Sequence, residues 1–132
     1  MEPSIFTKIV NGEIPAYKIA EDENYLAFLD VFPTTKGHTL VIPKQQTDYI
    51  FDLDDALYLG LMAFAKKIAA AIEKAVPCKR IGISVVGLEV PHAHVHLIPL
   101  NKMQDMNFAN KQQFSKEAFE ETAAKIKAAY NG

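Results

Sequence analysis

The sequence predicts an α+β fold in which helices pack on an antiparallel sheet. Short extended segments follow one another with brief turns between them, which favours antiparallel pairing. One segment in the middle of the chain repeats apolar residues at three- and four-residue steps over twenty positions, which predicts a long amphipathic helix. The 132 residues suit one domain, so we expect a single unit over residues 1–132.

The first third of the chain predicts one short helix followed by strands. Apolar residues at positions 5, 6, 9 and 10 favour a helix, which the turn chemistry of residues 11–15 ends. Extended segments follow, and the last of them is stopped by Pro43. They are Lys18–Glu21, Tyr25–Asp30 and His38–Ile42.

The rest of the chain predicts helix, strands and helix. Asp52–Asp55 opens the long helix with acidic residues at its positive end, and Pro77 closes it. Its apolar stripe consists of Leu53, Leu57, Leu61, Phe64, Ile68 and Ile72. Two extended segments, Arg80–Val86 and Val90–Leu100, lead to a last helix over Phe114–Tyr130.

The composition excludes several classes of protein. Fourteen Lys and Arg against sixteen Asp and Glu give a net charge of -2. The chain therefore lacks the excess of basic residues that is typical of nucleic-acid binders. No apolar run reaches the ~20 residues that span a bilayer, and the N-terminus has no secretory pattern. A single cysteine, Cys78, fits a reducing compartment. We therefore expect a cytoplasmic protein that binds neither nucleic acid nor membrane.

Three of the four histidines lie within five residues of one another. In an extended segment, side chains alternate between faces, so His92, His94 and His96 would share one face, with about 6.6 Å from each to the next. Ala93, Val95 and Leu97 would share the other face and can sit on the core.

Three interpretations of this cluster compete. The histidines could be half-buried polar residues without chemistry, although three at a strict period of two are uncommon. They could bind zinc, but Cys78 is isolated and Glu89 is the nearest carboxylate. They could carry nucleophilic and acid–base catalysis, because adjacent imidazoles can hold different protonation states near neutral pH. The third interpretation accounts best for the pattern.

The sequence resembles the histidine-triad family, and its Hint-type branch in particular. His92–Ile98 matches the pattern of three histidines that alternate with apolar residues. The resemblance covers about residues 4–100 and leaves the helical extension at about 110–130 outside. Further segments carry it: Ser4–Ile9, Gly12–Ala16, Ala27–Val31, Gly37–Lys44 and Gly87–Pro91.

The resemblance implies a hydrolase or transferase that acts at the α-phosphate of nucleoside 5'-phosphoramidates or related purine nucleotides. It implies that His94 is the nucleophile and forms a nucleotidyl-histidine intermediate. His96 would contact the phosphate and assist proton transfer, His92 would orient its neighbours, and His38 would belong to the same pocket. The alternatives are a dinucleoside polyphosphate hydrolase and a nucleotide-binding module with little turnover.

The resemblance also implies a set of substrate contacts. Asp30 would accept hydrogen bonds from the ribose hydroxyls, and Gly87 would let the backbone approach the phosphate. The walls of the base pocket would be Phe6, Ile9, Phe28 and Val31, residues that core packing could equally explain. A homodimer is implied, in which the long helix and a strand pair across a two-fold axis.

The chain departs from the family pattern at several positions. Ser4 and Thr7 stand where many relatives have a zinc-binding cysteine pair, so we expect no metal, and the chemistry requires no cofactor. Leu88 and Glu89 replace a glutamine and a small hydroxyl residue in the phosphate loop, which blurs contacts to the leaving group. Ser84 is the polar candidate in place of a substrate-contacting asparagine.

Overall fold

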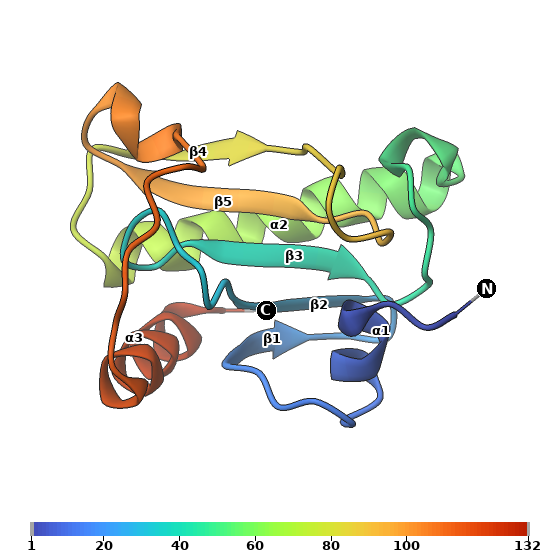
Figure 1. Cartoon of the computed structure of the whole chain (residues 1–132), viewed down its shortest axis with the longest axis horizontal. Helices are drawn as coiled ribbons and strands as arrows, with labels where there is room; N and C mark the ends of the chain where they lie inside the picture. Colours follow the sequence, from blue (N-terminus) through green and yellow to red (C-terminus); the bar gives the residue numbers. More distant parts are fainter. Residues whose placement is uncertain (1, 132) are drawn as a thin grey trace.

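The computed structural model describes residues 2–131, which form an antiparallel five-stranded sheet and three α-helices (Figure 1). This confirms the predicted α+β class. The strand order is β1-β2-β3-β5-β4. The strands are β1 (Lys18–Glu21), β2 (Tyr25–Leu29), β3 (Thr39–Pro43), β4 (Arg80–Ser84) and β5 (Val95–Leu100).

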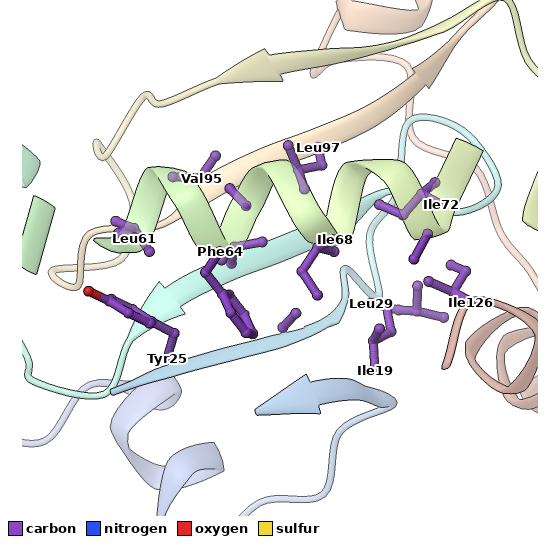
Figure 2. Close-up of a cluster of buried hydrophobic side chains, with 14 of the residues drawn as sticks. Ile19, Tyr25, Leu29, Leu61, Phe64, Ile68, Ile72, Val95, Leu97 and Ile126 are labelled. Atoms are coloured by element: carbon purple, nitrogen blue, oxygen red, sulfur yellow. The ribbon is translucent and has the colours of Figure 1, made fainter. Parts of the chain in front are cut away.

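The long helix α2 (Asp55–Ala75) covers one face of the sheet. Asp54 caps it by accepting a hydrogen bond from the backbone N–H of Leu57. The predicted apolar stripe points at the sheet and packs against the inward-facing residues of β2, β3 and β5 (Figure 2). Ala93, Val95 and Leu97 lie in this cluster, as the alternation predicted.

The other face of the sheet carries the short helix α1 (Ile5–Val10). Ser4 caps α1 with its hydroxyl, which accepts the N–H of Thr7. A second apolar cluster fills the space between α1 and the sheet. It consists of Phe6, Ile9, Leu26, Phe28, Leu40 and Ile42.

The C-terminal part of the chain runs past one end of the sheet before it forms its helix. After β5 comes the short 3-10 helix η2 (Met103–Met106), and residues 107–115 then run past the strand ends to α3 (Lys116–Ala129) (Figure 1). A second 3-10 helix, η1 (Ile50–Asp52), precedes α2. α3 packs against α2 and β1, and its Ile126 is fully buried in the main core. We refer to residues 107–115 as the linker.

One predicted strand is shorter than expected. β5 begins at Val95, so His92 and His94 precede the strand although the alternation placed them in it. The register pairs Val41 with Val95 and would bring Pro43 opposite Ala93. Proline has no N–H to donate to the ladder, and the N–H of Ala93 instead donates to Thr47.

The other boundaries differ from prediction by at most three residues, the largest difference being the start of α2 at Asp55 instead of Asp52. β2 ends one residue earlier than expected, at Leu29, and β3 is shifted by one residue to Thr39–Pro43. β4 stops two residues early, at Ser84, and α3 starts two residues late, at Lys116. Within the described chain, no helix has the length and apolar character needed to cross a membrane.

Candidate active site

His94 lies immediately before β5, with one ring nitrogen tied to the backbone. Its Nδ1 lies 2.7 Å from the carbonyl oxygen of His92. A carbonyl oxygen can only accept, so Nδ1 carries a proton and the neutral ring presents the lone pair of Nε2. The ring packs edge-on against Phe6 of α1, with the two ring centroids 5.0 Å apart. His94 is therefore held as a nucleophile would need to be.

His92 is buried and held at both ring nitrogens. Its Nε2 lies 2.7 Å from the carbonyl oxygen of Pro43, so this nitrogen donates. Its Nδ1 is then an acceptor and lies 2.8 Å from the hydroxyl of Ser4, which donates to it while accepting the N–H of Thr7. With its ring fixed in this way, His92 also fixes its own carbonyl, the acceptor for His94.

His38 and His96 form a hydrogen-bonded pair. The backbone N–H of Thr34 donates to Nδ1 of His38 over 3.0 Å, so the proton of neutral His38 sits on Nε2. That Nε2 lies 2.9 Å from Nδ1 of His96 and donates to it. The remaining proton of neutral His96 is then on its own Nε2. The ring centroids of His94 and His96 are 5.0 Å apart, so both face one small region.

Three of the four histidines, His38, His92 and His96, are kept neutral by burial. Burial, which penalises the charged form, lowers the pKa of His38, His92 and His96 below the usual range of histidine. The neighbouring imidazoles of His38 and His94 also lower the pKa of His96, and Asp30 opposes them. The charge of Lys111 lowers the pKa of both His38 and His96. Neutral imidazoles are the state that nucleophilic attack and directional hydrogen bonding both require.

Asp30 follows β2 and borders the histidine pair. Its Oδ1 accepts the N–H of Phe32 over 2.8 Å, and its Oδ2 lies 3.5 Å from Nε2 of His38. Asp30, His38 and His96 each offer a ligand atom, and these atoms lie within 4.8 Å of one another. However, the Thr34 hydrogen bond places a proton on His38 Nε2, the atom that a metal would need. The tautomer that these hydrogen bonds imply therefore suits a hydrogen-bond network better than a metal.

The predicted base-pocket residues divide into two groups. Phe6, Ile9 and Phe28 are buried between α1 and the sheet, where they pack as core. Val31 is 49% exposed beside Asp30. Of these four predicted residues, Val31 is the one that presents an exposed apolar surface, next to Asp30 in the chain. The ring of Phe6 also packs against the rings of His92 and His94.

The residues predicted for the phosphate loop lie between β4 and β5. Ser84 pairs directly with His96 across the two strands, which puts both side chains on the same face. Gly87 adopts a positive φ of 74°, a conformation that favours glycine. Leu88 and Glu89 are both exposed, Leu88 at 88%. The end of β4 therefore places Ser84 next to His96, and the loop that follows turns at Gly87.

The structure adds residues that the sequence did not reveal. Phe108 of the linker packs edge-on against His96, with 4.7 Å between ring centroids, and Lys111 lies over the Phe108 ring. Thr34 anchors His38 through its backbone. No periodicity or motif marked these three positions. Ser4 stands where many relatives have a cysteine, and the structure shows that its hydroxyl holds His92.

Together, the fold and the arrangement of imidazoles define a histidine-triad protein. Comparison with known proteins agrees, since residues 11–103 match the HIT domain. The chain therefore belongs to the HIT family.

Three relatives illustrate the match. An uncharacterised HIT-like protein of Borreliella burgdorferi is 38% identical over 135 residues, which span 96% of this chain and 97% of that protein. The adenosine 5'-monophosphoramidase hnt1 of Schizosaccharomyces pombe is 41% identical over 97 residues, 72% of each chain. The crystal structure of a HIT-like protein from Bartonella henselae, described as involved in cell-cycle regulation and holding an unknown ligand, superposes with a TM-score of 0.84. Its sequence is 34% identical, with 96% of this chain and 95% of that chain covered.

Proposed function

We propose that this HIT protein is a Hint-type nucleotide hydrolase or transferase that cleaves nucleoside 5'-phosphoramidates, or related purine nucleotides, at the α-phosphate. One observation carries the proposal. The bond from His94 Nδ1–H to the carbonyl of His92 leaves the Nε2 lone pair of His94 free, beside the Nε2–H of His96. A nucleophile and a hydrogen-bond donor on neighbouring imidazoles suit displacement at phosphorus. The similarity to a yeast adenosine 5'-monophosphoramidase supports the same substrate class.

In the first step, Nε2 of His94 attacks the α-phosphorus. A bond forms between phosphorus and Nε2, while the bond to the leaving nitrogen breaks and its electron pair goes to that nitrogen. The leaving nitrogen takes a proton from water and departs as the amine. His94 then carries a proton on Nδ1 and phosphorus on Nε2, so its ring is cationic, and the carbonyl of His92 stabilises that charge.

In the second step, water attacks phosphorus from the solvent side. The bond between phosphorus and Nε2 breaks, the nucleoside monophosphate leaves, and the water proton goes to solvent, so His94 returns to its neutral form. His96 donates from Nε2 to a phosphoryl oxygen in both steps. Its Nδ1 already accepts from His38, which favours a hydrogen-bonding role over proton transfer.

The nucleoside would bind beside the histidine pair. The Oδ2 of Asp30 is free of backbone contacts and can accept a ribose hydroxyl, and exposed Val31 offers an apolar surface for the base. Ser84 and the turn at Gly87 would border the phosphate.

The test is hydrolysis of adenosine 5'-phosphoramidate by the wild type and by His94→Ala. We expect turnover in the wild type, loss of at least about a thousandfold in the variant, and a labelled nucleotidyl-protein in quenched wild-type reactions. Equal rates for both proteins would remove the nucleophile assignment. Binding of AMP without turnover or a labelled protein would instead indicate a binding module, and a preference for diadenosine polyphosphates would indicate a polyphosphate hydrolase.

A further inference from the structure

Gln46, in the loop after β3, holds the start of α1 through three hydrogen bonds. Its Oε1 accepts the backbone N–H of Ser4 over 2.8 Å and the hydroxyl of Thr7 over 2.7 Å. Its Nε2 donates to the backbone carbonyl of Glu2 over 3.0 Å. Gln46 is 39 to 44 residues away from these partners in the chain, so one side chain joins the N-terminal segment to the end of the sheet.

The orientation of the Gln46 amide is fixed by its partners. A backbone N–H can only donate and a backbone carbonyl can only accept, so Oε1 faces Ser4 and Nε2 faces Glu2. The amide oxygen can only accept, so the hydroxyl proton of Thr7 points at Gln46. The Thr7 hydroxyl therefore has no proton left for another acceptor.

This arrangement decides which hydroxyl serves His92. The Nδ1 atom of His92 accepts, because its Nε2 donates to the carbonyl of Pro43. The hydroxyls of Ser4 and Thr7 lie 2.8 Å and 3.3 Å from that Nδ1. Since the proton of Thr7 is already committed, Ser4 is the hydroxyl that donates to His92. The network thus has one arrangement of protons, and Gln46 selects it.

Two contacts carry this arrangement to His94. The first is the carbonyl of His92, the residue whose ring Ser4 holds, which accepts Nδ1–H of His94 over 2.7 Å. The second is Phe6, which lies on the helix that Gln46 holds. Its ring packs against those of His92 and His94, with centroid distances of 5.9 Å and 5.0 Å. A shift in the start of α1 would therefore move both the acceptor and the packing surface of His94.

A metal ion does not fit this cluster. Ser4 and Thr7 stand where the family resemblance implies a zinc-binding pair of cysteines, but neutral hydroxyls are not the ligands of structural zinc sites. The lone pair of His92 Nδ1 is also engaged, since it accepts from Ser4. This chain therefore ties α1 to His92 with directed hydrogen bonds.

We propose that Gln46 is a positioning residue for the nucleophile, because it orders the hydroxyls of Ser4 and Thr7 and, through His92, holds the ring of His94. This inference rests on the proposed function, since it assigns the attack on phosphorus to His94. The side-chain hydrogen bonds of Gln46 within the described chain end at the N-terminal segment. Its loss should therefore lower kcat and leave KM nearly unchanged.

Hydrolysis of adenosine 5'-phosphoramidate by three variants tests this role. Gln46→Leu removes both donor and acceptor, and we expect kcat to fall about tenfold with KM within about twofold of the wild type. Gln46→Glu keeps an oxygen that accepts from Ser4 and Thr7, and should keep kcat within about threefold. Gln45→Leu is the matched control. Gln45 is exposed and its amide bonds to the hydroxyl of Thr47, so this variant should match the wild type.

Nitrogen NMR of the imidazole rings gives a readout that needs no turnover. Two-bond proton–nitrogen correlation spectra show which ring nitrogens carry a proton, and a donor at an unprotonated nitrogen displaces its resonance. Gln46→Leu should displace the Nδ1 resonance of His92, because the freed proton of Thr7 then competes with that of Ser4. In a Thr7→Val background no second proton is available, so the same substitution should displace that resonance much less. Gln46→Glu should leave it in place.

The outcomes separate this inference from the proposed function. A loss of kcat in Gln46→Leu that Gln46→Glu restores, together with the displaced His92 resonance, supports the positioning role. An unchanged resonance in Gln46→Leu, or equal defects in Gln46→Leu and Gln46→Glu, overturns it even if the protein hydrolyses phosphoramidates. Zinc that copurifies and whose chelation displaces the same resonance overturns it as well. If no turnover is detected but the resonance responds as expected, the ordering by Gln46 stands and only the proposed hydrolysis fails.

Discussion

The Nε2 atom of His38 lies 2.9 Å from Nδ1 of His96, and the direction of that hydrogen bond is set by the backbone. Because the N–H of Thr34 donates to the other nitrogen of His38, only Nε2 of His38 can carry the proton. His96 is consequently left with its proton on Nε2. The residue that precedes β3 thus selects the tautomer of a residue on β5, and this makes His38 a positioning residue for His96.

The first prediction concerns this positioning role. His38→Ala removes the donor, so the ring of His96 loses both its orientation and its preferred tautomer. We expect kcat for phosphoramidate hydrolysis to fall about 10- to 100-fold, with a smaller change in KM, because misplacement of a group that acts in the transition state affects mainly kcat. His38→Gln can donate from its amide and should recover part of the loss. Equal defects in both variants would assign His38 a packing role only.

The second prediction concerns stability in acid. Burial lowers the pKa of His38 and His96 from 6.5 to about 3 in the folded protein. The unfolded chain therefore binds more protons below pH 6.5, and the contribution of these histidines to stability is complete above that pH and declines as pH falls toward 3. At about pH 5, each such histidine would cost ~2 kcal/mol, since one pKa unit corresponds to about 1.4 kcal/mol. Urea unfolding at several pH values measures the decline.

Carboxylates also titrate in this window, so a variant must isolate the histidines. In His38→Asn with His96→Asn, neither side chain titrates, and the free energy of unfolding should fall less steeply between about pH 6.5 and 5 than in the wild type. If the free energy of unfolding depends on pH in the same way in both proteins, His38 and His96 are protonated equally well in the folded and the unfolded chain, which would contradict the effect of their burial.

The third prediction concerns the hydroxyl of Ser4. It caps α1 and also bonds to Nδ1 of buried His92, so Ser4→Ala removes two interactions at once. We expect a loss of about 2 kcal/mol in the free energy of unfolding, more than the ~1 kcal/mol typical of a cap alone. Ser115→Ala is the matched control, because Ser115 caps α3 from an exposed position. Equal losses in the two variants would mean that the bond to His92 adds nothing.

The fourth prediction concerns the contact between α2 and β2. A Cβ at Gly60 would meet the hydroxyl of Tyr25, which donates to the carbonyl of Leu57. Gly60→Ala should destabilise the protein by about 1–2 kcal/mol, although alanine favours helices by up to ~1 kcal/mol over glycine. In a Tyr25→Phe background the same change should cost less, because the colliding oxygen is gone. Chemical denaturation of the wild type, the two single variants and the double variant measures the four free energies of unfolding. If Gly60→Ala costs the same with Tyr25 as with phenylalanine at that position, the contact is contradicted.

Periodicity predicted most of the fold because burial follows it closely. The stripe of α2 and the alternation around Val95 both face the core as expected. The start of β5 could not be read in the same way, since it depends on which residue of β3 lies opposite. Continued along the strands, the register would place Pro43 opposite Ala93, where the pairing stops. The pairing partner of a residue is not encoded near it in the chain.

The candidate site was predictable only where it lies in one segment. The triad motif marked His92, His94 and His96, whereas the tautomer of His96 depends on Thr34, more than sixty residues away. The linker carries no pattern, because Phe108 acts through its contacts with His96 and His38, which lie far from it in the sequence. Hydrogen-bond direction and long-range contact are properties of the folded chain, and local sequence patterns do not specify them.

The last prediction concerns the homodimer that the family resemblance implies. β4 lies at one edge of the sheet, and β5 is its neighbour on the inner side. Ile83 on β4 is 50% exposed. Val85 and Val86, which follow β4, are 38% and 50% exposed. An exposed apolar edge strand invites pairing, and antiparallel pairing of β4 with its own copy would bury these residues on both partners across a two-fold axis.

Sedimentation velocity at micromolar concentration should therefore show a dimer for the wild type and a monomer for Ile83→Lys, because each dimer would bury two unpaired ammonium groups at its centre. Leu88→Lys is the matched control. Leu88 is 88% exposed on the loop after β4, and the same charge there should leave the dimer intact. A monomeric wild type, or dissociation by both substitutions alike, would contradict pairing through β4. If Ile83→Lys is monomeric and still hydrolyses phosphoramidates at the wild-type rate, each protomer holds a complete site.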